Sequence, residues 1–132
     1  MAPAAIAPLN PEAVASAAAA IPKAPILDLV VSAFDALADP TRARILYALT
    51  SQPLCVRDLA VLTRVSESAV SHQLRLLRER RLVKPVRRER NQIEYQLDDH
   101  HVAALFREAE YHADHVLQGR PDHAYQPRGM GG

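Results

Sequence analysis

The chain of 132 residues is long enough for one ordinary domain with a buried core and too short for two independent domains. Its single cysteine excludes a disulfide framework, and no apolar run approaches the ~20 residues of a membrane helix, so we expect a cytoplasmic protein without a membrane partner. The formal net charge is only +1, but residues 41–90 carry +8 while residues 1–40 and 91–132 carry −3 and −4, which is typical of a nucleic-acid-binding segment between segments with another task.

The first part of the chain differs in composition from the rest. Residues 1–25 are rich in Ala and Pro, so we predict a mobile arm, although a short helix over 10–20 is compatible with its sequence before Pro22. The structured domain is predicted to span residues 26–118. Residues 119–132 are expected to form a flexible tail.

Two helices are predicted at the start of this domain. From Ile26, apolar residues recur at helical spacing to residue 37. Asp39 is then a favourable N-cap for a second helix, because Pro40 occupies its first turn, where a missing N–H costs least. Three apolar residues of this second helix should face the core: Ile45, Leu46 and Leu49.

A helix-turn-helix follows. A short helix over 56–63 and a tight turn at 64–66 precede a longer helix over 67–80, for which Ser66 is a suitable N-cap. Apolar residues repeat along the longer helix at i, i+4 and i+7 and must point inward: Val70, Leu74 and Leu77.

A two-stranded hairpin is predicted after this helix. Residues 82–86 and 93–97 have strand composition and are joined by the basic segment 87–91. Pro85 implies an edge strand or a bulge. The expected fold is therefore mainly α with a small two-stranded β wing, a winged helix-turn-helix.

DNA binding is the function that this arrangement favours. Residues 75–90 hold eight of the sixteen Lys and Arg residues of the chain. The outward face of helix 67–80 carries short polar and basic side chains that can approach base edges and phosphates, and the wing tip adds three arginines. The predicted DNA-binding residues on these two elements are Ser68, Ser71, His72 and Arg75 on the helix, with Arg87, Arg88 and Arg90 on the wing.

A homodimer is expected on two grounds. One such unit covers little DNA, and these modules usually bind two half-sites about 34 Å apart as a dimer, so we predict an operator with an inverted repeat. The last predicted helix, residues 100–117, and the first, from Ile26, are amphipathic beyond what the wing and the helix pair cover. These two helices are the predicted dimer seam.

Five of the six histidines lie at or after position 100, and three of them share one face of the last helix. At ~100° per residue, His112 lies about 20° from His101 around the helix, and His115 lies about 40° to the other side. Asp99 lies at the start of the same helix. Three nitrogens and one carboxylate are a ligand set suited to Zn²⁺.

One helix cannot close this site, because His101 and His112 lie some 16 Å apart along the axis at ~1.5 Å per residue. Two antiparallel copies can close it, with Asp99 and His101 of one chain meeting His112 and His115 of the other, and two-fold symmetry then gives two sites per dimer. Tetrahedral Co²⁺ fits equally well. Ni²⁺ would need about six ligands, for instance with His123.

The sequence also resembles a known family, the ArsR–SmtB family of metal-responsive repressors, over about residues 26–115. Four segments carry the resemblance: 38–42 (ADPTR), 54–59 (LCVRDL), 65–74 (VSESAVSHQL) and 95–101 (YQLDDHH). It implies a homodimeric winged-helix repressor, not an enzyme, that binds its operator without metal and leaves it when metal binds. The last-helix site of the family falls on Asp99, His101, His112 and His115. Gln73, within the matched segment of the recognition helix, joins the predicted DNA-binding residues.

The chain departs from part of the family and leaves alternatives open. Members that sense soft metals carry Cys-x-Cys, whereas Val56 and Arg57 follow Cys55 here, which weakens an arsenic, lead or cadmium interpretation and favours a buried core thiol. The alternatives are a metal-insensitive winged-helix regulator, whose histidines only pack the dimer seam, and, more remotely, a small zinc hydrolase or metal carrier. Against the latter, no His-Glu-x-x-His, nucleophile elbow or phosphate loop is present.

Overall fold

The computed structural model describes residues 5–119 of the chain. The chain divides after Asp35 into two compact units, each of which is described by itself. None of the helices within the described residues is both long and apolar enough to cross a membrane.

The first unit contains α1 (Pro11–Ala20) and most of α2 (Ile26–Leu37). The side chain of Asn10 caps α1, since its oxygen accepts a hydrogen bond from the backbone N–H of Ala13 at 3.0 Å. The short helix that the sequence allows is therefore present, and no residue of it is buried. Whether residues 1–25 are mobile stays a prediction.

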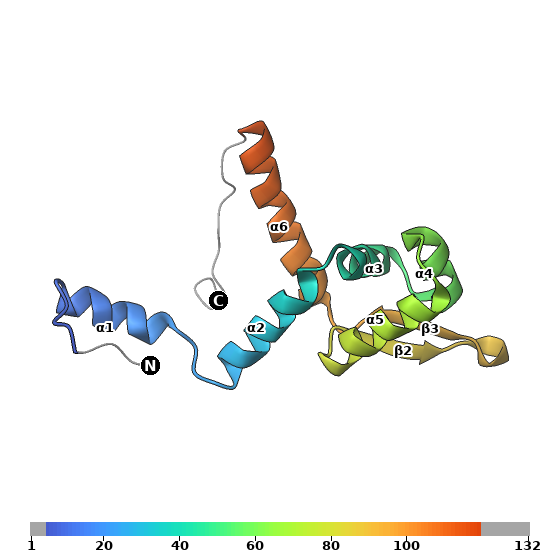
Figure 1. The fold of residues 1–132 in the computed structure, drawn as a ribbon, viewed down its shortest axis with the longest axis horizontal. Helices are drawn as coiled ribbons and strands as arrows, with labels where there is room; N and C mark the ends of the chain where they lie inside the picture. Colours follow the sequence, from blue (N-terminus) through green and yellow to red (C-terminus); the bar gives the residue numbers. More distant parts are fainter. Residues whose placement is uncertain (1–4, 120–132) are drawn as a thin grey trace. The chain divides into compact units, whose positions relative to one another are not determined.

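The second unit has the predicted element order with two additions (Figure 1). A two-residue strand, β1, precedes the helix-turn-helix, and a single 3₁₀ turn, η1, forms the hairpin tip. The elements are α3 (Pro40–Ser51), β1 (Leu54–Cys55), α4 (Val56–Thr63), α5 (Glu67–Glu79), β2 (Val83–Arg87), η1 (Glu89–Asn91), β3 (Ile93–Leu97) and α6 (His100–Gln118).

The sheet is antiparallel in the order β1-β3-β2. Leu54 of β1 pairs with Tyr95 of β3, and β2 pairs with β3 from Val83 opposite Leu97 to Arg87 opposite Ile93. The prediction of two strands is thus corrected to three, because β1 is too short to show an alternating pattern. The expected edge position of Pro85 is confirmed, since β2 lies at one side of the sheet.

Local hydrogen bonds set the helix-turn-helix as the sequence predicts. Arg64 adopts a left-handed conformation (φ 61°) that ends α4, and the hydroxyl of Ser66 accepts a hydrogen bond from the N–H of Ala69 at 3.0 Å at the start of α5. At the start of α3, the carboxylate of Asp39 accepts from the N–H of Arg42 at 3.0 Å. Both predicted N-caps are confirmed.

The core of the second unit is aliphatic and draws on its helices and on β2. The predicted inward faces of α3 and α5 are confirmed as buried, and burying each such side chain contributes roughly 1.5–3 kcal/mol. Its members include Ile45, Leu46 and Leu49 of α3, Leu59 of α4, Val70, Leu74 and Leu77 of α5, Val83 of β2, and Val102 and Phe106 of α6.

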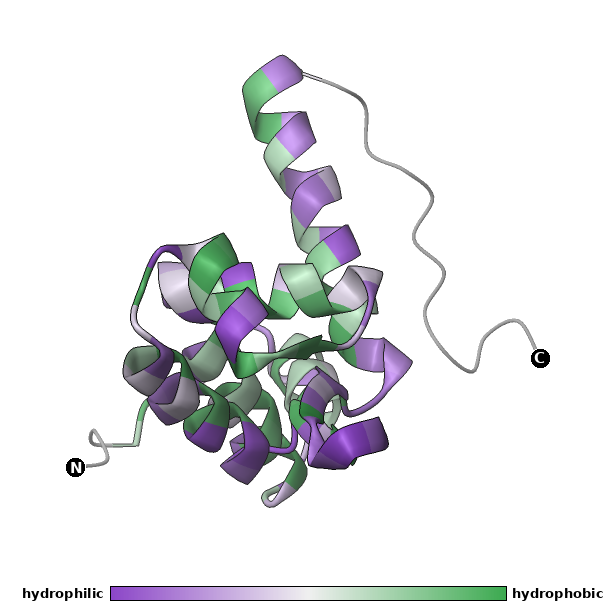
Figure 2. Ribbon diagram, turned by 90° about the vertical axis from the view of Figure 1, so that its right-hand side faces the viewer, coloured by the Kyte–Doolittle hydropathy of each residue, from purple (hydrophilic) through white to green (hydrophobic). Residues whose placement is uncertain are grey.

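Helix α6 leaves this core after its first two turns. Val102 and Phe106 are buried, whereas Val116 and Leu117 near the other end are 65% and 81% exposed. Figure 2 shows this end of α6 projecting beyond the rest of the second unit, with hydrophobic as well as hydrophilic residues along it. Gly119 ends the helix in the left-handed conformation, with φ 63°.

Candidate nucleic-acid interface and metal ligands

The recognition helix α5 presents a polar face opposite its buried one. Ser68, His72 and Arg75 are exposed and Ser71 is half-buried, while the apolar residues of α5 fill the core. Short side chains near the N-terminus of such a helix let its backbone approach a base edge, and a long cation reaches phosphates or guanine. The geometry of this face is therefore suited to the major groove.

Gln73 lies in a different environment from these four residues. It is half-buried, and its side-chain oxygen accepts a hydrogen bond from Nη1 of Arg42 on α3 at 3.3 Å. The structure thus links Gln73 to a helix 31 positions earlier in the chain.

The hairpin tip carries three exposed arginines with different partners. Nε of Arg88 donates to Oε1 of Glu94 at 2.7 Å, and Nη1 of Arg87 donates to the side-chain oxygen of Asn91 at 3.3 Å. Arg90 lies at the turn itself with φ 61°, followed by Asn91 with φ 58°. The tip is basic and held in a defined shape, but part of the charge of Arg88 is compensated by Glu94.

A basic hollow of ≈310 Å³ lies between α5 and the hairpin, and of its two arginines the sequence analysis had assigned only Arg87 to DNA binding and had missed Arg78. Arg78 follows Arg75 by three positions, so helical spacing places both on one side of α5 and was the signal that could have found it. The lining residues are Arg78, Pro85, Arg87, Ile93 and Tyr95.

Asp99 and His101 are brought together at the start of α6. Oδ1 of Asp99 accepts a hydrogen bond from the backbone N–H of His101 at 2.9 Å, and it lies 3.3 Å from Nδ1 of the same residue. Two ligand atoms each ~2.0–2.1 Å from a tetrahedral ion lie about 3.3 Å apart, so this pair has a spacing that fits two corners of a zinc site. Both side chains are about half exposed, which leaves room for further ligands.

His112 and His115 lie farther along α6 and are exposed. Among residues 5–119 of a single chain, no three His, Cys, Asp or Glu side chains come close enough to share an ion. The structure therefore supplies the two halves of the predicted ligand set separately, at the two ends of one helix. His123 lies outside the described residues.

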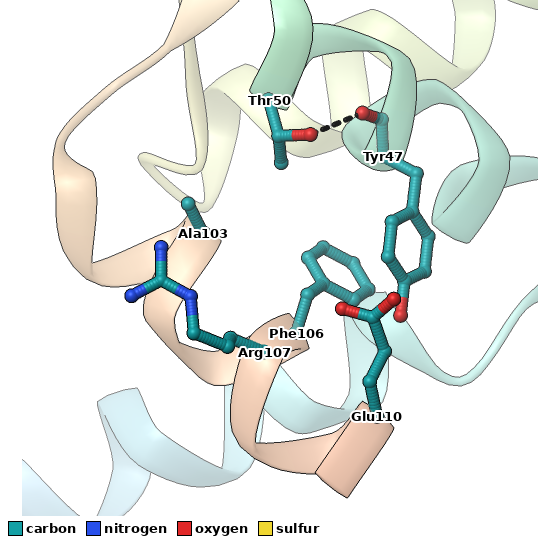
Figure 3. A pocket seen from close by; sticks show the side chains of 6 residues that line it. All are labelled: Tyr47, Thr50, Ala103, Phe106, Arg107 and Glu110. Atoms are coloured by element: carbon teal, nitrogen blue, oxygen red, sulfur yellow. Dashed lines mark hydrogen bonds between the residues drawn. The ribbon is translucent and has the colours of Figure 1, made fainter. Parts of the chain in front are cut away.

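A second hollow, of ≈320 Å³, separates α3 from α6 (Figure 3). The rings of Tyr47 and Phe106 stack at its edge, with centroids 4.3 Å apart and planes at 41°. Burial raises the pKa of the Tyr47 phenol, and the carboxylate of Glu110, which Figure 3 shows beside that ring, raises it further. This contact anchors the first half of α6 on α3. Thr50, Ala103 and Arg107 complete the lining.

Cys55 is half-buried and not fully buried as predicted. It occupies the N-cap position of α4 without a side-chain hydrogen bond to that helix, at the end of β1. Its place in a two-residue strand at the edge of the sheet explains the remaining exposure.

The sequence is similar to known bacterial regulators. Residues 39–84 match the family described as "Bacterial regulatory protein, arsR family". The chain is 58% identical over 85 residues to the transcriptional repressor SmtB homolog of Synechocystis sp., a match that spans 64% of this chain and only 61% of that protein's length. It is 48% identical over 93 residues to the HTH-type transcriptional regulator NmtR of Mycobacterium tuberculosis, spanning 70% of this chain and 77% of that protein.

Solved structures agree with these relatives. The homodimeric winged helix-turn-helix DNA-binding domain of a possible ArsR-family transcriptional regulator from Mycobacterium bovis matches with a TM-score of 0.66 and 30% identity, covering 75% of this chain and 91% of that one. The cadmium metal-sensor CmtR from Mycobacterium tuberculosis matches with a TM-score of 0.54 and 34% identity, covering 74% and 94%. The predicted winged helix-turn-helix is confirmed.

Proposed function

Since the chain belongs to the arsR family of bacterial regulatory proteins, we propose that it represses transcription as a cytoplasmic homodimer bound to an inverted-repeat operator, and that it leaves the operator when its α6 helices take up Zn²⁺. It acts through binding alone and is not an enzyme. Co²⁺ can take the place of Zn²⁺ with the same four residues, whereas Ni²⁺ would require further ligands beyond them.

The DNA-binding part rests on the polar face of α5 and the basic hairpin tip. Ser68, Ser71, His72 and Arg75 enter the major groove, and Arg87, Arg88 and Arg90 bind phosphates beside it. Arg78 joins them from the same side of α5. The fold match to the Mycobacterium bovis winged helix-turn-helix DNA-binding domain supports this assignment.

The dimer rests on two helices whose apolar side chains the chain itself leaves exposed. Phe34 of α2 is 57% exposed and Val116 of α6 is 65% exposed. Covering such side chains with a second copy removes apolar area from water and favours association. The Mycobacterium bovis relative is itself homodimeric.

The metal part is carried by one observation, the 3.3 Å spacing of Asp99 Oδ1 and His101 Nδ1. These two atoms of one copy, with the imidazoles of His112 and His115 from the other, make a four-coordinate set of oxygen and nitrogen donors. The bound cation supplies a bond between the two α6 helices. Asp99 also caps α6, so a change in its side chain acts directly on the helix start.

Repression then ends because metal binding at α6 and operator binding at α5 are linked by a coupling free energy. The two α6 helices, once linked, favour a dimer shape in which the two α5 helices no longer match successive major grooves. Coupling of ~1–3 kcal/mol changes operator affinity about 5–150-fold. That range is sufficient to switch a promoter.

The experiment begins by selecting the operator from a random duplex library with metal-free protein, and then follows its binding by fluorescence anisotropy with and without Zn²⁺. We expect Zn²⁺ to weaken binding at least about fivefold. The double variant His112→Gln with His115→Gln should bind the operator normally without this response. His100→Gln, which removes a histidine of the same helix outside the proposed ligand set, is the control and should respond as the unaltered chain does.

A metal-insensitive regulator gives a different result. If Zn²⁺ does not change the operator affinity of the unaltered protein, the proposed regulation is wrong. The histidines then only pack in the dimer seam. If the double variant keeps the zinc response of the unaltered chain, the ligand assignment is wrong. The spectrum of Co²⁺-loaded protein separates tetrahedral from octahedral coordination and so distinguishes a four-ligand site from one with additional ligands.

A further inference from the structure

Arg42 joins three parts of the second unit by hydrogen bonds. Its backbone N–H donates to the capping carboxylate of Asp39 at 3.0 Å, and Nε donates to the carbonyl oxygen of Ala36 at 2.8 Å. Nη1 donates to the side-chain oxygen of Gln73 on the recognition helix at 3.3 Å. One guanidinium therefore connects the last turn of α2, the start of α3 and the middle of α5.

These contacts require arginine. A guanidinium carries donors in a rigid planar fork, so it can reach two acceptors on separate segments at once. Ala36 is 1% exposed, and Arg42 and Gln73 are half-buried, so water competes less for these bonds than at an exposed site. A lysine at position 42 presents a single point of donation and cannot span both acceptors in the same way.

The contact also limits what Gln73 can do on DNA. A glutamine reads adenine with both its amide oxygen and its amide nitrogen. Here the oxygen of Gln73 already accepts from Arg42. His72, the preceding residue of the same helix, is exposed and can therefore approach a base edge.

We propose that Gln73 is a positioning residue, which holds the recognition helix to the α2–α3 junction through Arg42, and that this bond carries the state of the dimer to α5. The second part rests on the proposed function, because α2 then belongs to the dimer seam. Ala36 lies in the last turn of α2, so a displacement of α2 at the seam moves the carbonyl to which Nε of Arg42 donates. The guanidinium and Gln73 must follow it.

The test uses the full chain with two substitutions at one position. Gln73→Leu removes the acceptor, while Gln73→Glu keeps an acceptor and adds a charge opposite Arg42. Arg42→Lys should behave as Gln73→Leu does. Arg44→Lys, at an exposed arginine of the same helix, is the matched control. Far-UV circular dichroism and zinc stoichiometry establish that each variant folds and still binds the metal.

Two measurements are made on each variant. The first is the base preference obtained by selection from a random duplex library with metal-free protein. The second is the ratio of operator Kd with Zn²⁺ to operator Kd without it. We expect the base preference of Gln73→Glu to match that of the unaltered chain, and the ratio to fall about fivefold in Gln73→Leu, given the strength of hydrogen bonds to charged donors, and to be retained in Gln73→Glu.

The opposite results overturn the proposal. A changed base preference in Gln73→Glu makes Gln73 a base-reading residue, and an unaltered ratio in Gln73→Leu removes the bond from the coupling. If the unaltered chain itself shows no zinc response, the proposed function fails. The selection experiment still decides in that case between a positioning and a base-reading Gln73.

Discussion

Helices α5 and α6 both carry an apolar stripe at helical spacing, but the two stripes lie in different environments. The apolar stripe of α5 is fully covered, since Val70, Leu74 and Leu77 are at most 1% exposed. The stripe of α6 is covered only over its first two turns, and Val116 remains 65% exposed. Periodicity thus identifies the apolar face of a helix but not what covers it. The chain itself covers the apolar stripe of α5, whereas the second half of the stripe of α6 stays exposed, and we propose that a second copy covers it.

The largest expected difference between the two helices concerns stability. Leu77→Ala empties a fully buried site and should lower the free energy of unfolding by about 2–5 kcal/mol. Leu117→Ala, a matched change at a leucine that is 81% exposed, should lower it by less than about 0.5 kcal/mol. Urea unfolding at several protein concentrations measures both values and separates any contribution from association. Equal losses of unfolding free energy in the two variants would contradict the conclusion that the chain covers the apolar stripe of α5 but not the far end of that of α6.

The elements that could be predicted are those with local signals. The caps at Asp39 and Ser66 and the spacing of apolar residues placed the start of α3 and both ends of α4 and α5 within one residue of their observed bounds. Strand β1 was missed because two residues show no period. The half-buried state of Cys55 followed from that strand and was missed with it.

In the candidate sites too, contacts between residues close in sequence were predictable, and contacts between distant residues were not. Asp99 and His101 are two positions apart, so their contact follows from the geometry of a helix start and was predictable. The bond between Arg42 and Gln73 joins residues 31 positions apart that form no charge pair, and neither helix carries a pattern that indicates it. Only the packing of α3 on α5 determines that contact.

A change of association is the second expected effect. Val116→Asp places a carboxylate on the apolar stripe of α6, and burying it in a dimer seam is costly, so the Kd of the dimer should rise at least about tenfold. Gln118→Asp adds the same group about 160° around the helix and should leave the dimer intact. Sedimentation velocity over a range of concentrations measures both. Equal weakening in the two variants would mean that the stripe is not the seam.

The smallest expected effect is a pH dependence of stability that comes from the contact between α3 and the first half of α6. Burial and Glu110 raise the pKa of the Tyr47 phenol above its usual value of 10.0, so the folded chain holds this proton more tightly than the unfolded chain does. The corresponding stability is fully present below pH 10 and is lost as the pH rises from there through the pKa of the folded chain. Tyr47→Phe keeps the ring beside Phe106 and has no proton to lose. The difference in free energy of unfolding between the unaltered chain and this variant should therefore shift against the unaltered chain only above pH 10.

Tyr111→Phe provides the control for this measurement, because Tyr111 is an exposed tyrosine of α6 that is not part of the Tyr47–Phe106 ring pair. Urea unfolding at intervals between pH 8 and the alkaline limit, about pH 11, follows all three proteins across the range in which a tyrosine titrates. If Tyr111→Phe reproduces the alkaline shift of Tyr47→Phe, the effect does not come from the α3–α6 contact.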